Sequence, residues 1–463
     1  LGSVQGWRGI AGAELCPARL GLEGRLSVRR LAAVILIAVI AAGLGPSGES
    51  MAQVTTEQRY VALKDVTVKG VLHIPTGARP RVGILVMHED ANFLNHLACT
   101  EMSRRGFAVM CVNGRADNNE ALDRWNDLPL DAALGVRYLR ETVKVEKVVL
   151  FAHSGGGPLL SFYQSVAENG PAICNDARKL APCDQSLDGL PPADGIVFFD
   201  AHPGTAIALL RGLDASVVSE DDPTKTDPAL DPYSPANGYR PKGASKYSEA
   251  FKKRYYAAQA ARMNRLVAMA LDRRSKMQAG TYPYPDDDVF YIPRAAAWLI
   301  RVDTSIEAAT LKPRRLLRND GRIEERIVRT VRKPDPRQAA NNSTFDGGKL
   351  LTVHSFLGTR AVRATDSLDG IDLLSNNNST AANLRNIKVP ILMMAAQAHY
   401  FIRDNEQMFE GAASPDKELI YIEGASHGIV PCTWCHRNRD AYSNSVANTF
   451  DHAKAWIDKR FAP

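Results

Sequence analysis

A serine in a glycine-rich turn is the first candidate for chemistry in this sequence. The stretch FAHSGGGPLL, residues 151–160, places Ser154 after an apolar run and before three glycines. It nearly matches G-x-S-x-G, with Ala152 in place of the first glycine. A turn of this kind between a strand and a helix exposes the serine hydroxyl and aims helix-terminal amides at a developing oxyanion. We predict that Ser154 is a nucleophile; the alternative is a ligand-binding turn without nucleophilic chemistry.

A serine hydroxyl needs a general base, and His427 is the candidate. The stretch IYIEGASHGI, residues 420–429, places it in the loop after the last apolar strand. Among the ten histidines, it alone combines a strand-end loop with a position after every other predicted core strand. The alternative is a structural loop histidine.

The elements that would position these two residues alternate between strands and helices. A strand pair is expected at 60–75, and apolar runs that fit buried parallel strands lie at 82–88, 107–113, 147–152, 195–200, 389–396 and 417–424. Helix patterns lie at 95–106, 128–141, 157–169, 404–413 and about 443–460. This alternation predicts an α/β fold with a mostly parallel, doubly wound sheet.

The alternation stops between Gly204 and about Asn386, which is too long a segment for a plain loop. It contains a helical stretch at 247–274 and a hairpin-like stretch at 316–331, and we expect a large, mainly helical cap. The predicted division is 1–52 for an N-terminal extension and signal peptide, 53–204 for the first part of the core, 205–385 for the cap insertion and 386–463 for the second part of the core.

The turn at Ser154, the order of the strands and the chain order serine, aspartate, histidine resemble the α/β-hydrolase-fold serine hydrolases. The resemblance runs through 60–204 and 386–460. It implies a carboxylesterase-like enzyme that cleaves a small-molecule ester, lactone or thioester through an acyl-enzyme, without cofactor or metal. A cap favours small or medium substrates over chains, although this rests on the fold analogy.

The resemblance leaves three carboxylates open as the triad acid. In many such hydrolases the acid follows the strand that matches 389–396, where this chain has His399. Asp404 and Glu406 come later and also fit the cap and first turn of a helix. Other members carry the acid one strand earlier, where Asp200 ends an apolar run. We choose Asp200, which could instead be a strand-end residue bonded to loop amides, and keep Asp404 and Glu406 in reserve.

The oxyanion hole implied by the resemblance consists of two backbone N–H groups. The first is that of Gly155, directly after the serine. In the family, the loop after the strand that matches 82–88 begins His-Gly and supplies the second. Here His88 matches and Glu89 replaces the glycine, so we assign the second donor to the N–H near Asp90.

Six of the seven cysteines follow residue 52, and an even number in an exported chain suggests disulfides. The plausible local pairs are Cys174 with Cys183 and Cys432 with Cys435. Cys99 and Cys111 could pair or remain buried thiols. The stretch CTWCH, 432–436, also matches the c-type haem attachment signal, so a haem protein is a less favoured alternative. A zinc site there lacks a fourth ligand at suitable spacing.

The N-terminus has the pattern of a secretory signal peptide. Arg25, Arg29 and Arg30 precede the apolar run 31–44, and small residues at 50–52 fit cleavage after Ala52. We expect a periplasmic or secreted protein without stable membrane insertion after cleavage; an uncleaved anchor is the alternative.

The charge gives no argument for nucleic acid as a partner. The formal net charge is +6, of which residues 1–52, with five arginines and three glutamates, carry +2. The remaining +4 is too small for a nucleic-acid surface. The densest basic run, 312–333, alternates apolar and charged residues about an Asn-Asp-Gly turn, which favours a solvated hairpin. A non-catalytic binding protein on the same fold remains an alternative, because His399 replaces the usual acid.

Overall fold

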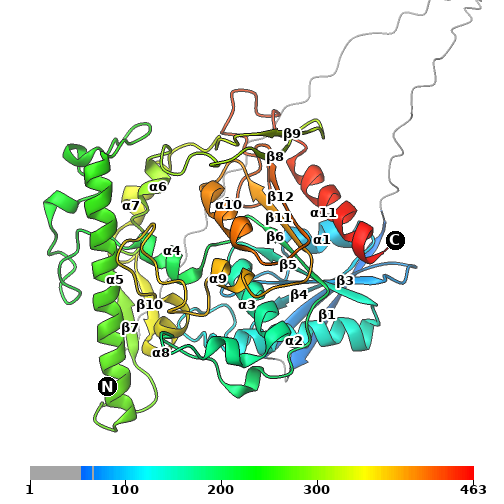
Figure 1. Ribbon diagram of the computed structural model, residues 1–463, viewed down its shortest axis with the longest axis horizontal. Helices are drawn as coiled ribbons and strands as arrows, with labels where there is room; N and C mark the ends of the chain where they lie inside the picture. Colours follow the sequence, from blue (N-terminus) through cyan, green and yellow to red (C-terminus); the bar gives the residue numbers. More distant parts are fainter. Residues whose placement is uncertain (1–53, 65–66, 463) are drawn as a thin grey trace, which may run out of the picture. The chain divides into compact units, whose positions relative to one another are not determined.

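A ten-stranded sheet organises the chain in the computed structural model, which describes residues 54–64 and 67–462 (Figure 1). The predicted signal peptide lies outside the described residues. In spatial order the strands are β1 (Thr56–Lys64), β2 (Val68–Pro75), β4 (Ala108–Asn113), β3 (Val82–Met87), β5 (Lys147–His153), β6 (Gly195–Phe199), β11 (Ile391–Ala396), β12 (Lys417–Ile422), β8 (Arg314–Leu317) and β9 (Ile323–Arg326).

The middle of this sheet is parallel and buried on both faces. Strands β4, β3, β5, β6, β11 and β12 pair in parallel along their lengths. Their nearly continuous apolar sequences follow from this, because a strand covered on both sides has no solvent face for polar residues. Only the hairpin of β1 and β2 at one edge and strand β9 at the other run antiparallel to their neighbours.

Helices cover both faces, so the doubly wound fold class is confirmed. On one face α1 (Leu97–Ser103) and α11 (Ser445–Phe461) contribute Met102, Phe450 and Trp456 to one apolar cluster. On the other face α2 (Asp127–Arg137), α3 (Gly156–Asn169) and α10 (Ile402–Gly411) contribute Leu160 and Met408 to a second cluster. The two clusters draw on alternate residues of the same strands.

The basic stretch 312–333 forms a hairpin, but its place differs from our expectation. We assigned it to the cap, whereas β8 pairs in parallel with β12 and extends the central sheet. The exposed edge of β12 offers unpaired backbone groups, and β8 satisfies them. Ion pairs such as Arg315 with Glu418, at 2.6 Å, hold the charged residues of the hairpin at the surface.

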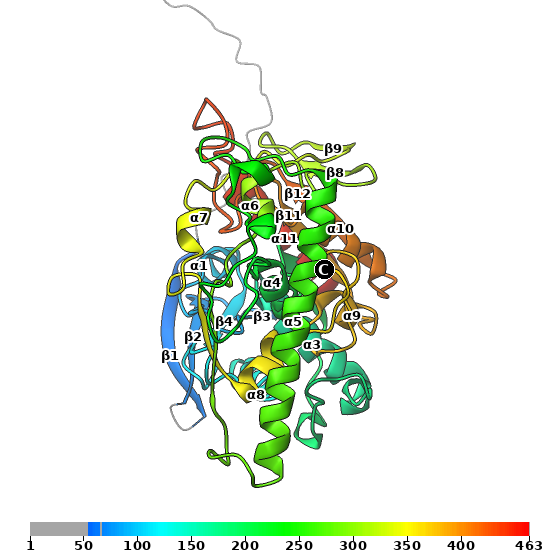
Figure 2. The same ribbon diagram turned by 90° about the vertical axis from the view of Figure 1, so that its left-hand side faces the viewer.

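Most of the rest of the segment 205–385 packs around two apolar clusters of its own beside the sheet. Its longest element is α5 (Glu249–Gln278), on the left in Figure 1 and in front in Figure 2. The Ser248 hydroxyl accepts a hydrogen bond from the Phe251 N–H and caps this helix. Around α5 pack α4 (Thr205–Gly212) and a two-stranded sheet of β7 (Val289–Ile292) and β10 (Lys349–Thr352).

Six cysteines form three disulfides. The two local pairs expected from spacing, Cys174–Cys183 and Cys432–Cys435, are both present. The third, Cys99–Cys111, joins α1 to β4 and decides the question that the sequence left open. A disulfide between Cys432 and Cys435 occupies both sulfurs that thioether attachment of haem would need.

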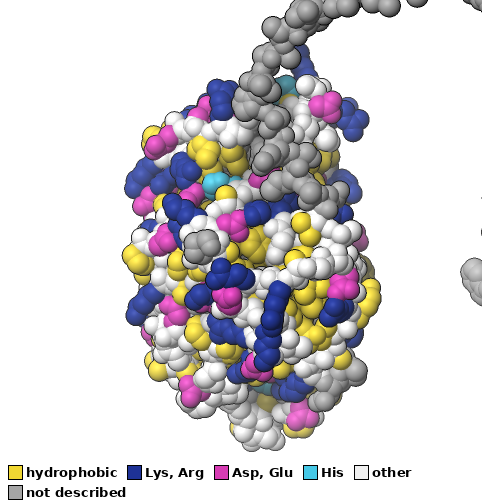
Figure 3. All heavy atoms as spheres, turned by 90° about the vertical axis from the view of Figure 1, so that its right-hand side faces the viewer, with side chains coloured by type: hydrophobic (Ala, Val, Ile, Leu, Met, Phe, Trp, Pro, Cys, Tyr) yellow, Lys and Arg dark blue, Asp and Glu magenta, His cyan; other side chains and the backbone are white. Residues whose placement is uncertain are grey.

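The surface carries mixed charge. On the face drawn in Figure 3, lysine and arginine side chains are interspersed with aspartate and glutamate. Interspersed charges of this kind are typical of a solvated surface. Within residues 54–64 and 67–462, every helix is too short or too polar to cross a bilayer.

Candidate active site

Ser154 lies in a tight turn between β5 and α3 and has a left-handed backbone, with φ of 56°. A non-glycine residue in this region is strained, and such strain is typical of a nucleophile at a strand-to-helix turn. A Cβ on Gly156 would lie 2.5 Å from the Met87 carbonyl oxygen, and one on Gly157 would lie 2.6 Å from Ala201 Cβ. The glycines after the serine therefore allow the turn to pack against the ends of β3 and β6.

The structure brings Ser154, His427 and Asp200 into one hydrogen-bonded line. Ser154 Oγ is 2.8 Å from His427 Nε2, and His427 Nδ1 is 2.6 Å from Asp200 Oδ2. The three residues follow β5, β12 and β6, whose carboxyl ends meet at one edge of the parallel sheet. This is the geometry of a serine–histidine–aspartate triad. The catalytic roles themselves stay predictions.

Asp200 is completely buried and ionised. Burial would raise the pKa of its carboxyl group, but His399 and His427 beside it bring that pKa well below its usual value. Its Oδ1 also accepts a hydrogen bond from the Ala396 N–H at 3.3 Å. An ionised carboxylate at this position holds the Nδ1–H tautomer of His427 and leaves Nε2 free to accept the serine proton.

His399 stands where many such hydrolases carry the acid, and it packs against Asp200. Its Nδ1 lies 2.7 Å from Asp200 Oδ2, and its ring stacks on that of His427 with centroids 4.3 Å apart. Burial lowers the pKa of His399 to about 4, so the ring is neutral at neutral pH. Asp200, His399 and His427 offer three atoms within 4.8 Å of one another that could hold a metal, and one of these atoms, His427 Nδ1, already forms a hydrogen bond with Asp200.

The two reserve acids lie in other interactions. Asp404 accepts two hydrogen bonds from Arg211 Nη1, at 2.9 and 3.0 Å. Glu406 accepts from the Leu311 N–H at 2.6 Å and from Arg314 Nε at 2.9 Å. Both carboxylates thus tie α10 to the segment 205–385, and the structure does not bring either of them to His427.

Both predicted oxyanion donors face the ring of His88. The Gly155 N–H donates to Nε2 at 3.0 Å, and the Asp90 N–H lies 3.1 Å from Nδ1. A neutral imidazole has a single acceptor nitrogen, so only one of these hydrogen bonds forms at a time. The assignment of Gly155 and Asp90 stays a prediction, and it requires the ring of His88 to release the amide that serves the oxyanion.

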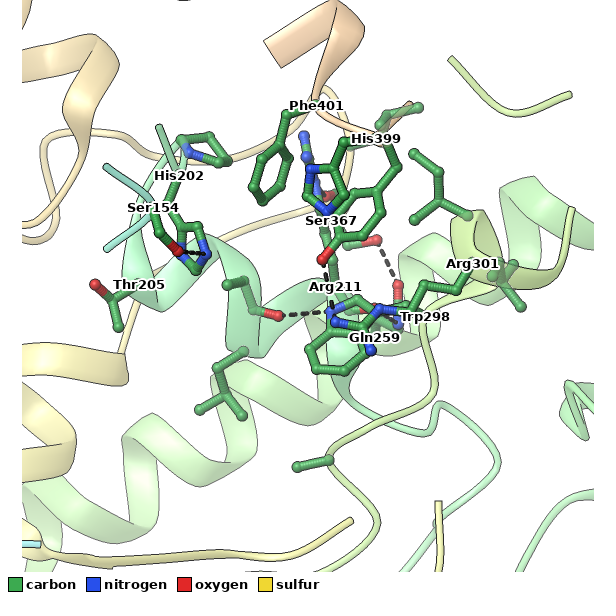
Figure 4. Close-up of a pocket in the computed structure, with 18 of the residues that line it drawn as sticks. Ser154, His202, Thr205, Arg211, Gln259, Trp298, Arg301, Ser367, His399 and Phe401 are labelled. Carbon is green, nitrogen blue, oxygen red and sulfur yellow. Dashed lines mark hydrogen bonds between the residues drawn. The ribbon is translucent and has the colours of Figure 1, made fainter. Parts of the chain in front are cut away.

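His202 is a site residue that the sequence analysis missed. Its Nε2 is 3.3 Å from Ser154 Oγ, and its ring packs edge-on against Phe401 (Figure 4). Burial lowers the pKa of His202 well below its usual value, so the ring is neutral. Its position two residues after Asp200, at the end of the same strand, was the signal that could have identified it.

Glu89, which replaces the family glycine, is buried beside the elbow. Its Oε2 accepts a hydrogen bond from Thr205 Oγ1 at 2.7 Å. Burial, with a contribution from the charge of Asp90, raises the pKa of this carboxyl group well above its usual value. Arg360 opposes this shift, since its Nη1 lies 3.7 Å from Glu89 Oε1.

A cavity of about 300 Å³ opens over Ser154 and His427. This size falls at the lower end of small-molecule sites. Core residues form one side, and the segment 205–385 forms the other. The apolar side chains that line the cavity include Leu209, Trp298, Leu299, Ile300, Ile306 and Phe401.

The parallel sheet, the strained elbow after β5 and the helices on both faces give this chain the α/β-hydrolase fold. No protein-family model and no curated protein sequence matches it. Similar solved structures include the siderophore hydrolase EstB from Aspergillus fumigatus, with 11% identity and a TM-score of 0.42 over 87% of this chain and 98% of that one. Carboxyl esterase 2 from Tuber melanosporum has 10% identity and a TM-score of 0.39 over 90% and 89%.

Proposed function

We propose that the protein is a serine hydrolase that cleaves carboxylic esters, or related lactones and thioesters, through an acyl-enzyme. The observation that carries this proposal is the line from Ser154 Oγ through His427 to Asp200 beneath a cavity of small-molecule size. A non-catalytic binding protein has no need for a strained serine with an imidazole in hydrogen-bonding contact.

In the proposed reaction, Ser154 Oγ attacks the acyl carbonyl while His427 Nε2 takes its proton. The ester C–O bond then breaks, and His427 returns the proton to the leaving alcohol. Water, activated by the same imidazole, attacks the acyl-enzyme and releases the acid. Asp200 stays ionised throughout and stabilises the imidazolium.

Hydrolysis of 4-nitrophenyl esters of increasing acyl length tests this function. We expect turnover, with a first burst of nitrophenol equal in amount to the enzyme wherever deacylation is slow. The smaller acyl groups should react best, because the cavity has a volume of only about 300 Å³. Absence of turnover on every ester would favour the binding-protein alternative.

We assign His202 to the oxyanion hole, together with whichever amide His88 releases. A neutral ring with its proton on Nε2 donates to Ser154 Oγ in the free enzyme, at 3.3 Å. The oxyanion that forms once Oγ has bonded to the acyl carbon is two bonds away from Oγ, so the same N–H is a candidate donor to it. This donor would act in a buried site, where such interactions are strong.

His202→Leu is expected to lower kcat by about 10²-fold with little change in KM, as loss of an oxyanion donor does. Steady-state kinetics on one ester measures this. His73→Leu is a matched control, because His73 is a buried histidine of β2 whose ring nitrogens have no partner among the described residues. Unchanged kcat in a folded His202→Leu variant would exclude the assignment.

The proposal includes export to an oxidising compartment. Three disulfides among the described residues support it, since reducing compartments rarely preserve structural disulfides. This agrees with the signal peptide predicted at 1–52.

A further inference from the structure

The cations that line the cavity are mostly neutralised by carboxylates. Three of the four lysine and arginine side chains that line it lie within ion-pairing distance of an acidic side chain, so their charges are already compensated. The pairs are Arg211 with Asp404, Arg360 with Asp90 and Glu120, and Lys349 with Glu120.

Arg301 is the exception. It lies on the short helix α6 (Leu299–Val302) and lines the same cavity, yet it forms no ion pair with any acidic residue in the described part of the chain. Its Nε also lacks a hydrogen-bond partner there. A partly buried guanidinium without a counter-ion is unfavourable, because it has lost water and gained no charged partner.

The side chain of Arg301 is nevertheless held in place. Its guanidinium lies over the ring of Trp298, 4.0 Å from the centroid, and Nη2 donates to Tyr400 Oη at 3.1 Å (Figure 4). Stacking on an aromatic face fixes the plane of the guanidinium and leaves its edge able to bind. A planar fork of N–H donors matches a carboxylate, which it binds through two parallel hydrogen bonds.

The position of Arg301 relates it to the proposed triad. Tyr400, its hydrogen-bond partner, has its ring 3.9 Å from that of His399, and His399 stacks on His427 at 4.3 Å. Two side chains therefore separate the guanidinium from the proposed base. A short carbon chain in the cavity could place a carbonyl at Ser154 and a second group at Arg301.

Glu307 adds another polar group to the lining of the cavity. Its Oε2 has no hydrogen-bond partner within the described ranges. Burial, aided by the charge of Asp404, raises its pKa to about 7, so a large fraction carries a proton at neutral pH. In that form it can donate a hydrogen bond to an anion and does not repel it.

We propose that Arg301 binds a carboxylate of the substrate, so that half-esters of short dicarboxylic acids are the preferred substrates. The esterified carboxyl group lies at Ser154, and the ionised one accepts hydrogen bonds from Arg301. Cleavage breaks the ester C–O bond, the alcohol leaves with the proton from His427, and water hydrolyses the acyl-enzyme to the dicarboxylate. The hydrolytic part rests on the proposed function, whereas the anion site stands on the cavity alone.

The test compares monomethyl glutarate with methyl pentanoate, which has the same acyl length without the charge. We expect the wild type to favour the half-ester in kcat/KM, and Arg301→Met to lower the ratio of the two values by about 10- to 100-fold. This range corresponds to loss of a hydrogen bond between charged groups, of about 1.5–3 kcal/mol. Arg301→Lys should retain part of the preference, since it keeps the charge and loses the fork.

The control is Arg322→Met, which removes an arginine of the β8–β9 turn whose side chain is 81% exposed. It should leave the ratio unchanged. An unchanged ratio in Arg301→Met would overturn the proposal. If neither kcat/KM value changes, Arg301 does not contact the substrate, and if both fall equally, its role is structural.

Binding of 5-oxohexanoate, a ketone that carries a carboxylate, separates the two proposals. Ligand-observed NMR should detect binding to the wild type and to Arg322→Met, and much weaker binding to Arg301→Met. Binding that depends on Arg301 without turnover of either ester would reject the hydrolase function and keep the anion site. Turnover of the neutral ester without binding that depends on Arg301 would keep the hydrolase function and reject the anion site.

Discussion

Replacing Ser154 by alanine is expected to lower kcat for ester hydrolysis by about 10³-fold or more and to abolish labelling by a fluorophosphonate. The hydroxyl is the atom that would form the acyl-enzyme, and removal of a triad nucleophile leaves only binding and oxyanion stabilisation. Fluorophosphonates react with a serine only where a base activates it, and His427 Nε2 lies 2.8 Å from Ser154 Oγ. Mass spectrometry of the labelled wild type should therefore place the adduct on the peptide that contains Ser154.

Ser161→Ala is the matched control for this experiment. Ser161 lies in α3, the helix that directly follows the turn of Ser154. It is fully buried, and its hydroxyl donates to the Pro158 carbonyl oxygen. Ser161→Ala removes a serine hydroxyl, as Ser154→Ala does, but it should cost far less of the activity. Labelling that persists in Ser154→Ala would assign the reactive hydroxyl to another serine and reject our nucleophile.

The parallel strands and the contacts among Ser154, His427 and Asp200 could be predicted because their signals are local. A continuous apolar run identifies a buried strand, and a polar residue at its carboxyl end lies at the same sheet edge as the others. This reasoning predicts Asp200 and His427, and the structure places His427 beside Ser154 and Asp200 beside His427. The prediction that these residues meet requires only the order of the strands and no knowledge of side-chain conformations.

Other parts of the site depend on packing that no local pattern contains. The pairing of β8 with β12 joins segments about a hundred residues apart, so an alternating pattern could reveal a hairpin but not its partner. His202 and the ring of His88 reach Ser154 and Gly155 through side-chain rotamers. Arg301 resembled any other arginine of a basic chain, because its lack of a counter-ion is a property of the folded cavity.

The identity of the acid gives the second large prediction. Asp200→Asn is expected to lower kcat by about 10⁴-fold, because an amide at this site favours the wrong tautomer of His427 and cannot stabilise the imidazolium. The variant keeps the shape of the side chain, which is fully buried. Steady-state kinetics measures the loss, and a thermal melt shows that the variant is folded.

Asp404→Asn and Glu406→Gln should behave in the opposite way and so act as matched controls. Both carboxylates are nearly buried and paired with arginines, so each substitution removes a buried ion pair. Asp404→Asn leaves Arg211 without its partner, whereas Arg314 keeps Glu410 in Glu406→Gln. Breaking such a pair costs about 3–5 kcal/mol where it is well buried, and these two variants should melt earlier than the wild type. Their kcat below the melting transition should remain close to normal, because neither side chain contacts His427.

The pH dependence of stability gives Asp200 a further signature. The folded-state pKa of Asp200 is lowered, so its ionised form stabilises the fold above the unfolded-state value of about 3.9, and this contribution is lost as the pH falls. Asp200→Asn should therefore flatten the decline in melting temperature below about pH 5. Near-normal kcat in Asp200→Asn, with collapse in either other variant, would place the acid after β11. Activity in all three would mean that Ser154 and His427 work as a dyad or that His427 is not the base.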